Sequence, residues 1–182
     1  MEHNIRIERL LPYSHEQVWQ AITDSKILGS WFMPNDLVPK LHEEFRFQMK
    51  PQRGWDGLTH CEVIELEAGK RIAFTYRGEA SGEKALACAN IHSRNADKVG
   101  KNIFTQLDTV LSFTLTPEYT CGGVEQTQLV MEHTGFKGIK LMVISLIMGY
   151  GWRKVLKRLS AVLESQKMGE VATPMSSELV KE

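Results

Sequence analysis

The side chains that could support metal chemistry in this chain are few and far apart. His60 and Cys61 are adjacent, and Cys88 is followed four positions later by His92, so thiolate and imidazole ligands are present. A tetrahedral zinc site needs a second close Cys/His pair to complete it, and the spacing supplies none. We therefore predict no metal site and no cofactor, and interpret these residues as core and loop positions.

Proton transfer is the other chemistry that the residue types allow. Glu62, Asp108 and Glu132 fall in segments that alternate like strands, and a carboxylate buried in a cavity can have a raised pKa. The alternation does not decide whether any of them faces inward. His133 comes at the end of the last strand-like segment, near the expected start of the final helix. It is a candidate site residue, and a hydrogen-bonded structural histidine is the alternative.

The clearest structural element is a helix after Gly149. Its apolar residues recur at three- and four-residue steps, which places them on one helical face: Trp152, Val155, Leu156, Leu159, Val162 and Leu163. Basic residues occupy the rest of the circumference: Arg153, Lys154, Lys157 and Arg158. Because strand-like segments precede this helix through most of the chain, we expect it to lie across a sheet and bury its apolar face there.

The segments before this helix predict an antiparallel sheet and two short helices. Ser14 and Gln17 have capping-box spacing, and Asp24 is a second helix cap. Alternation or β-rich composition predicts strands near residues 5–11, 45–49, 58–66, 71–76, 107–115 and 124–131. Pro117 is expected to end the fifth strand, and the run from Thr134 to Gly138 to break the sheet before the helix. The predicted fold class is α+β.

We predict one domain over residues 1–165. Residues 78–106 form an insertion, poor in large apolar residues, that we expect to be a mobile flap over a pocket mouth. Residues 166–182 are expected to be a polar, mobile tail.

Bulk properties exclude some functions and favour a cytoplasmic protein. The 22 basic and 22 acidic residues give a net charge of zero, so we expect no nucleic-acid partner. Three separated cysteines and a start without a signal-peptide apolar region favour reduced thiols in the cytoplasm. The apolar run from Leu141 to Met148 is too short for a membrane span. It is also too apolar for one face to bury, so we expect a homodimer contact or part of a pocket lid.

Several local sequences together resemble one family. They are Val18–Asp24 followed by Trp31-Phe32, Glu62–Glu65, His133–Phe136, and Gly151-Trp152 with Leu156, Leu159 and Leu163. Their order is similar to that of the family related to the activator of the heat-shock chaperone ATPase, within the START-like, or SRPBCC, superfamily. The resemblance implies a helix-grip fold, with an antiparallel sheet curved around a long C-terminal helix. Members of such families include co-chaperone domains and binders of lipids, hormones or polyketides.

The function we predict is non-enzymatic binding of a small apolar or aromatic ligand between the sheet and the helix. Pockets of this kind are mostly apolar with few polar groups. The predicted wall is formed by Trp31, Phe47, Phe113, His133, Trp152 and Leu156. One alternative is a co-chaperone-like interaction module acting on a heat-shock ATPase. Another is a cyclase- or hydrolase-type enzyme that uses a pocket carboxylate or His133.

Overall fold

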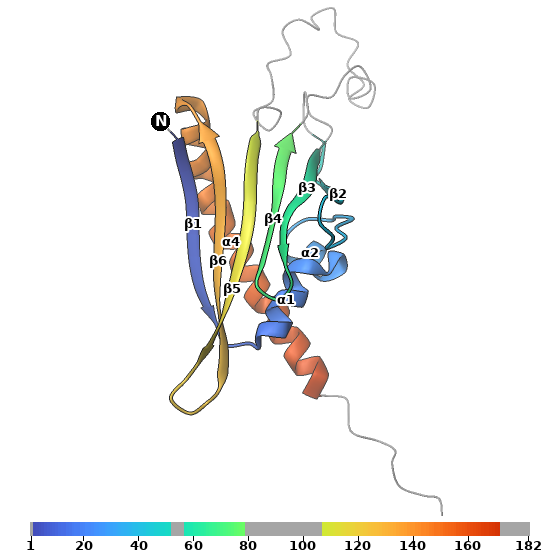
Figure 1. The fold of residues 1–182 in the computed structure, drawn as a ribbon, viewed down its shortest axis with the longest axis vertical. Coiled ribbons are helices and arrows are strands. Elements are labelled where there is room, and N and C mark those ends of the chain that lie inside the picture. Colours follow the sequence, from blue (N-terminus) through green and yellow to red (C-terminus); the bar gives the residue numbers. More distant parts are fainter. Residues whose placement is uncertain (1, 52–56, 79–106, 172–182) are drawn as a thin grey trace, which may run out of the picture.

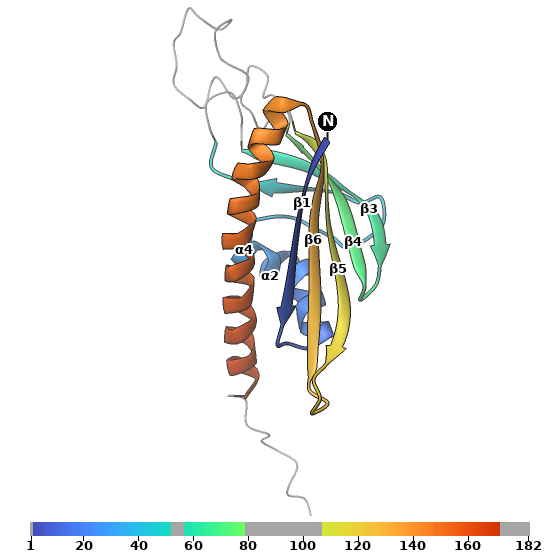
Figure 2. The same ribbon diagram turned by 90° about the vertical axis from the view of Figure 1, so that its left-hand side faces the viewer.

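The protein folds into one curved antiparallel sheet with its helices on a single face (Figures 1 and 2). The structure, a computed structural model, describes residues 2–51, 57–78 and 107–171 of the chain, with side chains described as far as residue 166. The predicted α+β class and the helix-grip arrangement are confirmed.

Six strands form the sheet, in the spatial order β1-β6-β5-β4-β3-β2. Their bounds are β1 Glu2–Leu11, β2 Glu44–Gln48, β3 Leu58–Glu67, β4 Arg71–Gly78, β5 Asp108–Tyr119 and β6 Glu125–Lys137. Every neighbouring pair is antiparallel. The first strand therefore lies beside the last one, which leads directly into the C-terminal helix.

Two short helices, α1 (His15–Thr23) and α2 (Ser25–Trp31), begin where their caps predict. The Ser14 side chain accepts a hydrogen bond from the Gln17 amide at 3.3 Å, and the Gln17 side chain accepts one from the Ser14 amide at 3.2 Å. Asp24 Oδ1 accepts hydrogen bonds from two backbone amides at the start of α2, both at 2.9 Å. These contacts satisfy donors that a helix start leaves free.

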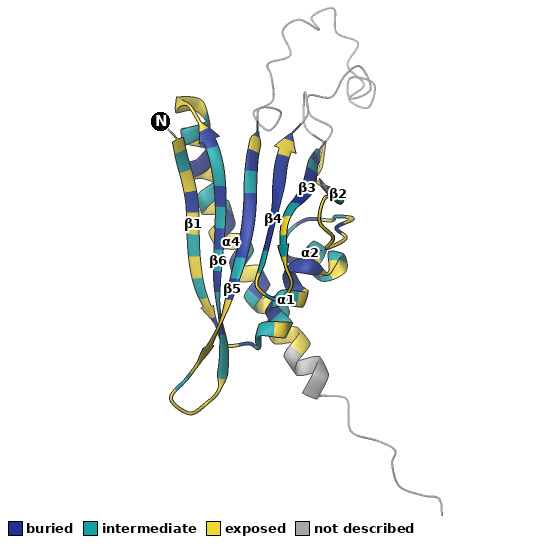
Figure 3. Ribbon diagram, in the orientation of Figure 1, coloured by how far each residue is buried: buried dark blue, intermediate teal, exposed yellow. Residues whose placement is uncertain are grey.

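The long helix α4 (Ile139–Val171) lies across the sheet and buries the predicted face. Trp152, Leu156, Leu159 and Leu163 are buried, and Val155 and Val162 are half-buried. Along β2 and β3 buried residues alternate with more exposed ones, whereas the central strand β4 is buried over five consecutive residues (Figure 3). The core therefore occupies the layer between the sheet and the three described helices.

Several predicted boundaries were wrong. β5 continues through Pro117 to Tyr119, because past Thr114 it pairs only with β6, and a strand with one free edge tolerates a proline. β6 continues through Gly135, which has a φ of 97°, and the chain turns at Gly138 instead. The helix begins at Ile139, directly after the run expected to precede it; it includes the apolar run before Gly149 and continues to Val171.

Some expectations lie outside the described residues. They concern the flap over residues 79–106, with Cys88 and His92 in it, and the tail over residues 172–182. Within the described ranges, no helix is long and apolar enough to cross a membrane.

Candidate functional site

All six residues of the predicted wall are buried in the layer between the sheet and the helices. Trp31 ends α2, and Trp152 and Leu156 lie one turn apart on the buried face of α4. The other three point inward from separate strands: Phe47 from β2, Phe113 from β5 and His133 from β6. The alternation of each strand sends these side chains toward the helices. The structure therefore brings together residues that are up to 125 positions apart in the sequence (31 to 156).

Aromatic contacts link five of these six residues. The Phe113 ring centroid lies 6.4 Å from that of Trp31 and 6.4 Å from that of Trp152, both in edge-on arrangements. Phe47 joins the group through Phe74, whose centroid lies 5.8 Å from Phe47 and 6.3 Å from Phe113. Such distances are typical of favourable aromatic packing. These rings form one continuous aromatic cluster.

Phe32 belongs to this cluster but was missing from the predicted wall. Its ring centroid lies 4.7 Å from Trp152 and 4.9 Å from Phe47, and the residue is half-buried. Phe32 is the C-cap of α2, with φ −109° and ψ −93°, so helical periodicity does not place its side chain. The only signal in the sequence is its position between Trp31 and Pro34.

A chain of hydrogen bonds crosses the cluster at His133. Trp152 Nε1 donates to His133 Nδ1 at 3.2 Å. Because Nδ1 accepts, Nε2 carries the proton of the neutral ring and donates to Thr109 Oγ1 at 2.8 Å. That hydroxyl in turn donates to the Tyr76 carbonyl at 3.1 Å. The chain links α4, β6, β5 and β4, and both ring nitrogens of His133 have partners.

Burial sets the protonation of this group. Desolvation lowers the pKa of His133 to about 3, so the ring is neutral near pH 7. Desolvation also raises the pKa of the Tyr76 hydroxyl above its ordinary value, with a smaller contribution from Cys61. Sequence reasoning missed Thr109, although it shares the inward face of β5 with Phe113. At the centre of the cluster is therefore a neutral, fully hydrogen-bonded imidazole.

The three candidate carboxylates lie on the opposite, outer face of the sheet. Asp108 pairs with Arg77 at 2.9 Å, and Glu62 contacts His42 at 3.1 Å. Glu132 accepts a hydrogen bond from Arg6 Nη1 at 2.7 Å. None of these three carboxylates reaches the aromatic cluster.

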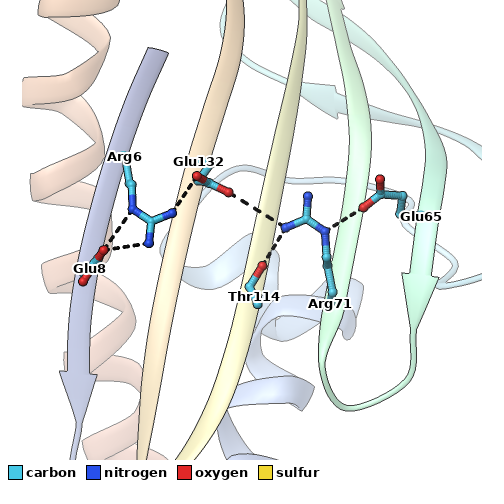
Figure 4. A network of polar contacts seen from close by, with 6 residues as sticks. All are labelled: Arg6, Glu8, Glu65, Arg71, Thr114 and Glu132. Carbon is cyan, nitrogen blue, oxygen red and sulfur yellow. Dashed lines mark hydrogen bonds and ion pairs between the residues drawn. The ribbon is translucent and has the colours of Figure 1, made fainter.

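Glu132 is part of a polar network that crosses the outer face of the sheet (Figure 4). Arg71 Nη1 lies 4.0 Å from Glu132 Oε2 and donates to Thr114 Oγ1 at 2.6 Å. Arg71 Nε donates to Glu65 Oε2 at 2.6 Å. Arg6, at the far end of the network, also pairs with Glu8, so the network ties β1, β6, β5, β4 and β3 together.

The metal-ligand candidates do not converge. Cys61 is buried, whereas its neighbour His60 lies on the outer face, as adjacent residues of a strand must. His60 lines a polar cleft of about 470 Å³ there, together with both charge types, including Glu44, Arg46 and Arg77. Among the residues that the structure describes, no group of three or more His, Cys, Asp or Glu side chains could hold a metal ion.

Solved structures of similar fold cover most of the chain. Protein MLL2253 from Mesorhizobium loti is 24% identical over 90% of this chain and 98% of its own, with a TM-score of 0.65. Bacillus halodurans protein BH1534 is 21% identical over 88% and 96%, with a TM-score of 0.60. The Aha1 dimer from Colwellia psychrerythraea is 18% identical over 89% and 96%, with a TM-score of 0.59. No curated protein matches the sequence.

A family model supplies the assignment that these structures alone cannot. It matches residues 12–164, which include both short helices, the sheet from β2 to β6, and α4 through Glu164. The matched region contains every residue of the aromatic cluster and of the hydrogen-bond series Trp152, His133, Thr109 and Tyr76. The protein therefore belongs to the family described as Activator of Hsp90 ATPase homolog 1-like protein.

Proposed function

We propose that the protein binds a small apolar or aromatic ligand between the sheet and α4 without transforming it. The observation that carries this proposal is the continuous aromatic cluster of Trp31, Phe32, Phe47, Phe113 and Trp152. It provides an extended apolar surface, beside which the neutral His133 imidazole is hydrogen-bonded to Trp152 and Thr109. Few polar groups in an apolar lining are typical of small-molecule sites.

Phe32 marks the point of entry in this proposal. It is half-buried, while the rings that it contacts, Phe47 and Trp152, are buried. It also follows the last residue of α2: its amide still donates to the Leu28 carbonyl at 2.9 Å, but its backbone angles are no longer helical. Rotation of this one side chain would expose the Trp152 indole to a ligand. A bound aromatic molecule would then replace the Phe32 ring against Trp152.

A fluorescence titration tests this proposal. The neutral probe N-phenyl-1-naphthylamine should bind saturably with a stoichiometry of one and quench Trp152. Leu156→Trp should abolish binding, because a larger ring one turn from Trp152 fills the same space. Val162→Trp, a half-buried position further along α4, is the matched control and should bind like the unchanged protein. Binding that Leu156→Trp leaves intact in a folded protein would refute the site.

The enzymatic alternative has less support. A general acid or base needs a pKa near the working pH, whereas the pKa of His133 is lowered to about 3. Glu62, Asp108 and Glu132 pair with other residues on the outer face of the sheet. The groups proposed for proton transfer are therefore either too weakly basic or on the wrong side of the sheet.

A co-chaperone-like role is the second candidate, because of the family to which the chain belongs. The family description refers to an activator of Hsp90 ATPase, and one similar structure is titled an Aha1 dimer. In this role the aromatic cluster would be solid core and the protein would act through its surface, in the cytoplasm, alone or as a homodimer. Addition of the protein to a purified Hsp90-type chaperone would then raise its ATPase rate, whereas the small-ligand proposal expects no change.

A further inference from the structure

The outward side of α4 carries a stripe of exposed apolar residues in its first three turns. Their exposures are Ile139 80%, Val143 50%, Leu146 61%, Ile147 69% and Tyr150 60%. Steps of four, three, one and three residues keep all five within about a quarter of the helix circumference. Trp152 and Leu156, on the other side of the helix, face the sheet. We call these five residues the apolar stripe.

Basic residues continue the same side of the helix. Arg153, Lys154, Lys157 and Arg158 are all exposed. Lys154 Nζ lies 4.6 Å from the centroid of the Tyr150 ring, so the apolar and basic parts meet at a cation–π contact. We call these four residues the basic cluster.

The charge of this stretch differs sharply from that of the whole chain. Residues 133–163 include Lys137 and Lys140 besides the basic cluster, and contain no Asp or Glu. The complete chain has equal numbers of basic and acidic residues. Glu132 and Glu164 flank this stretch in the sequence; Glu132 pairs with Arg6 on the outer face of the sheet, and Glu164 accepts a hydrogen bond from Tyr13. The exposed side of α4 is therefore cationic at both ends of the apolar stripe.

We propose that this side of α4 docks on an anionic lipid surface. The apolar stripe would enter the boundary between headgroups and acyl chains, with Tyr150 at headgroup level. The basic cluster, Lys137 and Lys140 would contact the lipid phosphates and carboxylates. A helix with basic residues beside exposed apolar ones binds membranes through buried apolar area together with attraction to anionic lipids. This mode of binding requires no membrane span.

The charges argue against a second copy as the occupant. A two-fold antiparallel contact centred on Leu146 would place Arg153 of one copy opposite Ile139 of the other, between Lys137 and Lys140. Like charges would then meet without an acidic residue of α4 to compensate them. An acidic protein would need a groove shaped to this convex helix, whereas a lipid surface adapts to it.

Vesicle co-sedimentation of the full chain tests the proposal. Binding should be strong to vesicles of phosphatidylcholine with 30% phosphatidylserine, and weak to phosphatidylcholine alone. It should also fall in 0.5 M NaCl, because salt screens the attraction. Leu146→Ser with Ile147→Ser should lower the partition coefficient at least about tenfold. Lys154→Gln with Lys157→Gln should lower it about 25-fold, at roughly fivefold for each charge.

Matched controls separate this role from general effects on the protein. Leu10→Ser with Val124→Ser removes two exposed apolar residues elsewhere, and Lys26→Gln removes a charge on α2. Both should bind like the unchanged protein, and circular dichroism should show all variants folded. Absent binding, or binding that the Leu146/Ile147 change leaves intact, would overturn the proposal. So would binding to polyglutamate without binding to vesicles, or a dimer through this stripe that binds no vesicles.

Discussion

Trp152 and His133 are joined by a hydrogen bond of 3.2 Å, in which the indole Nε1 donates to the imidazole Nδ1. It is a direct polar contact between α4 and the sheet, in a layer formed mainly by apolar side chains. Since Thr109 occupies the other ring nitrogen, the imidazole is fully satisfied although it is buried. A buried polar group costs little when it is paired and much when its partner is removed.

Replacement of His133 by leucine should therefore destabilise the protein by about 2–4 kcal/mol. The change leaves the buried Trp152 indole N–H without its acceptor and removes one of the two hydrogen bonds of the Thr109 hydroxyl, which keeps only its bond to the Tyr76 carbonyl. Urea unfolding followed by tryptophan fluorescence would measure the loss. Met131→Leu, two residues earlier on the same buried face of β6, is the control and should cost less than about 1.5 kcal/mol. Equal losses for the two variants would show that the hydrogen bonds contribute nothing beyond packing.

The low pKa of His133 predicts a specific dependence of stability on pH. Below pH 6.5 the unfolded chain binds a proton at this histidine, whereas the folded protein does not until pH falls to about 3. Protonation then favours the unfolded state, so stability falls as pH drops from 6.5 toward 3 and is unaffected above 6.5. The slope for one such group approaches about 1.4 kcal/mol per pH unit.

A comparison with His133→Gln isolates this contribution from that of the carboxylates. Unfolding free energies at half-unit steps from pH 7.5 to pH 4 should fall more steeply for the unchanged protein than for the variant. The two curves should run parallel above pH 6.5. Parallel curves over the whole range would mean that His133 binds its proton equally well in the folded and unfolded states.

The outer face of the sheet should tolerate the loss of its ion pairs. Arg71→Met removes the centre of the network in Figure 4, yet this side chain is 32% exposed and its partners are also in contact with water. We expect a loss of about 1 kcal/mol or less, and a smaller one in 0.5 M NaCl. Arg77→Met is the control on the same strand, because Arg77 pairs only with the highly exposed Asp108 among the described residues. A loss above 2 kcal/mol for Arg71→Met would show that the network is a main source of stability.

Local patterns predicted those parts of the fold that depend on neighbours in the sequence. The Ser14 capping box and the buried face of α4 follow from spacing within one element. Boundaries that depend on distant partners could not be predicted in this way. Pro117 remains inside β5 because β4 no longer borders the strand there, and the sequence around Pro117 carries no information about that neighbour.

The same distinction applies to the candidate site: local patterns predicted some of its residues, and the others depend on tertiary contacts. The alternation of apolar and polar residues along their strands correctly predicted that Phe47 and Phe113 face the helices. It therefore indicated an aromatic interior. The role of Phe32 depends on the backbone just after α2, and that of Thr109 on an imidazole in another strand. Both follow from tertiary contacts, which the composition of either segment does not indicate.

Gly135 should be intolerant of any side chain, unlike Gly138 three residues later. Both have positive φ, 97° and 88°, so alanine would cost about 1–2 kcal/mol at either position. At Gly135 the added Cβ would also lie 3.3 Å from the Thr109 Cα, a backbone atom of the neighbouring strand, whereas at Gly138 it would meet nothing within 4 Å.

Gly135→Ala should therefore destabilise the protein by at least about 1 kcal/mol more than Gly138→Ala. By displacing Thr109, it should also disturb the hydrogen bond between Thr109 and His133. Urea unfolding would measure the first effect, and the indole N–H resonance of Trp152 would report the second. Equal losses for the two variants, with that resonance unmoved, would mean that β5 yields to the methyl group and that the close approach at Gly135 has no structural role.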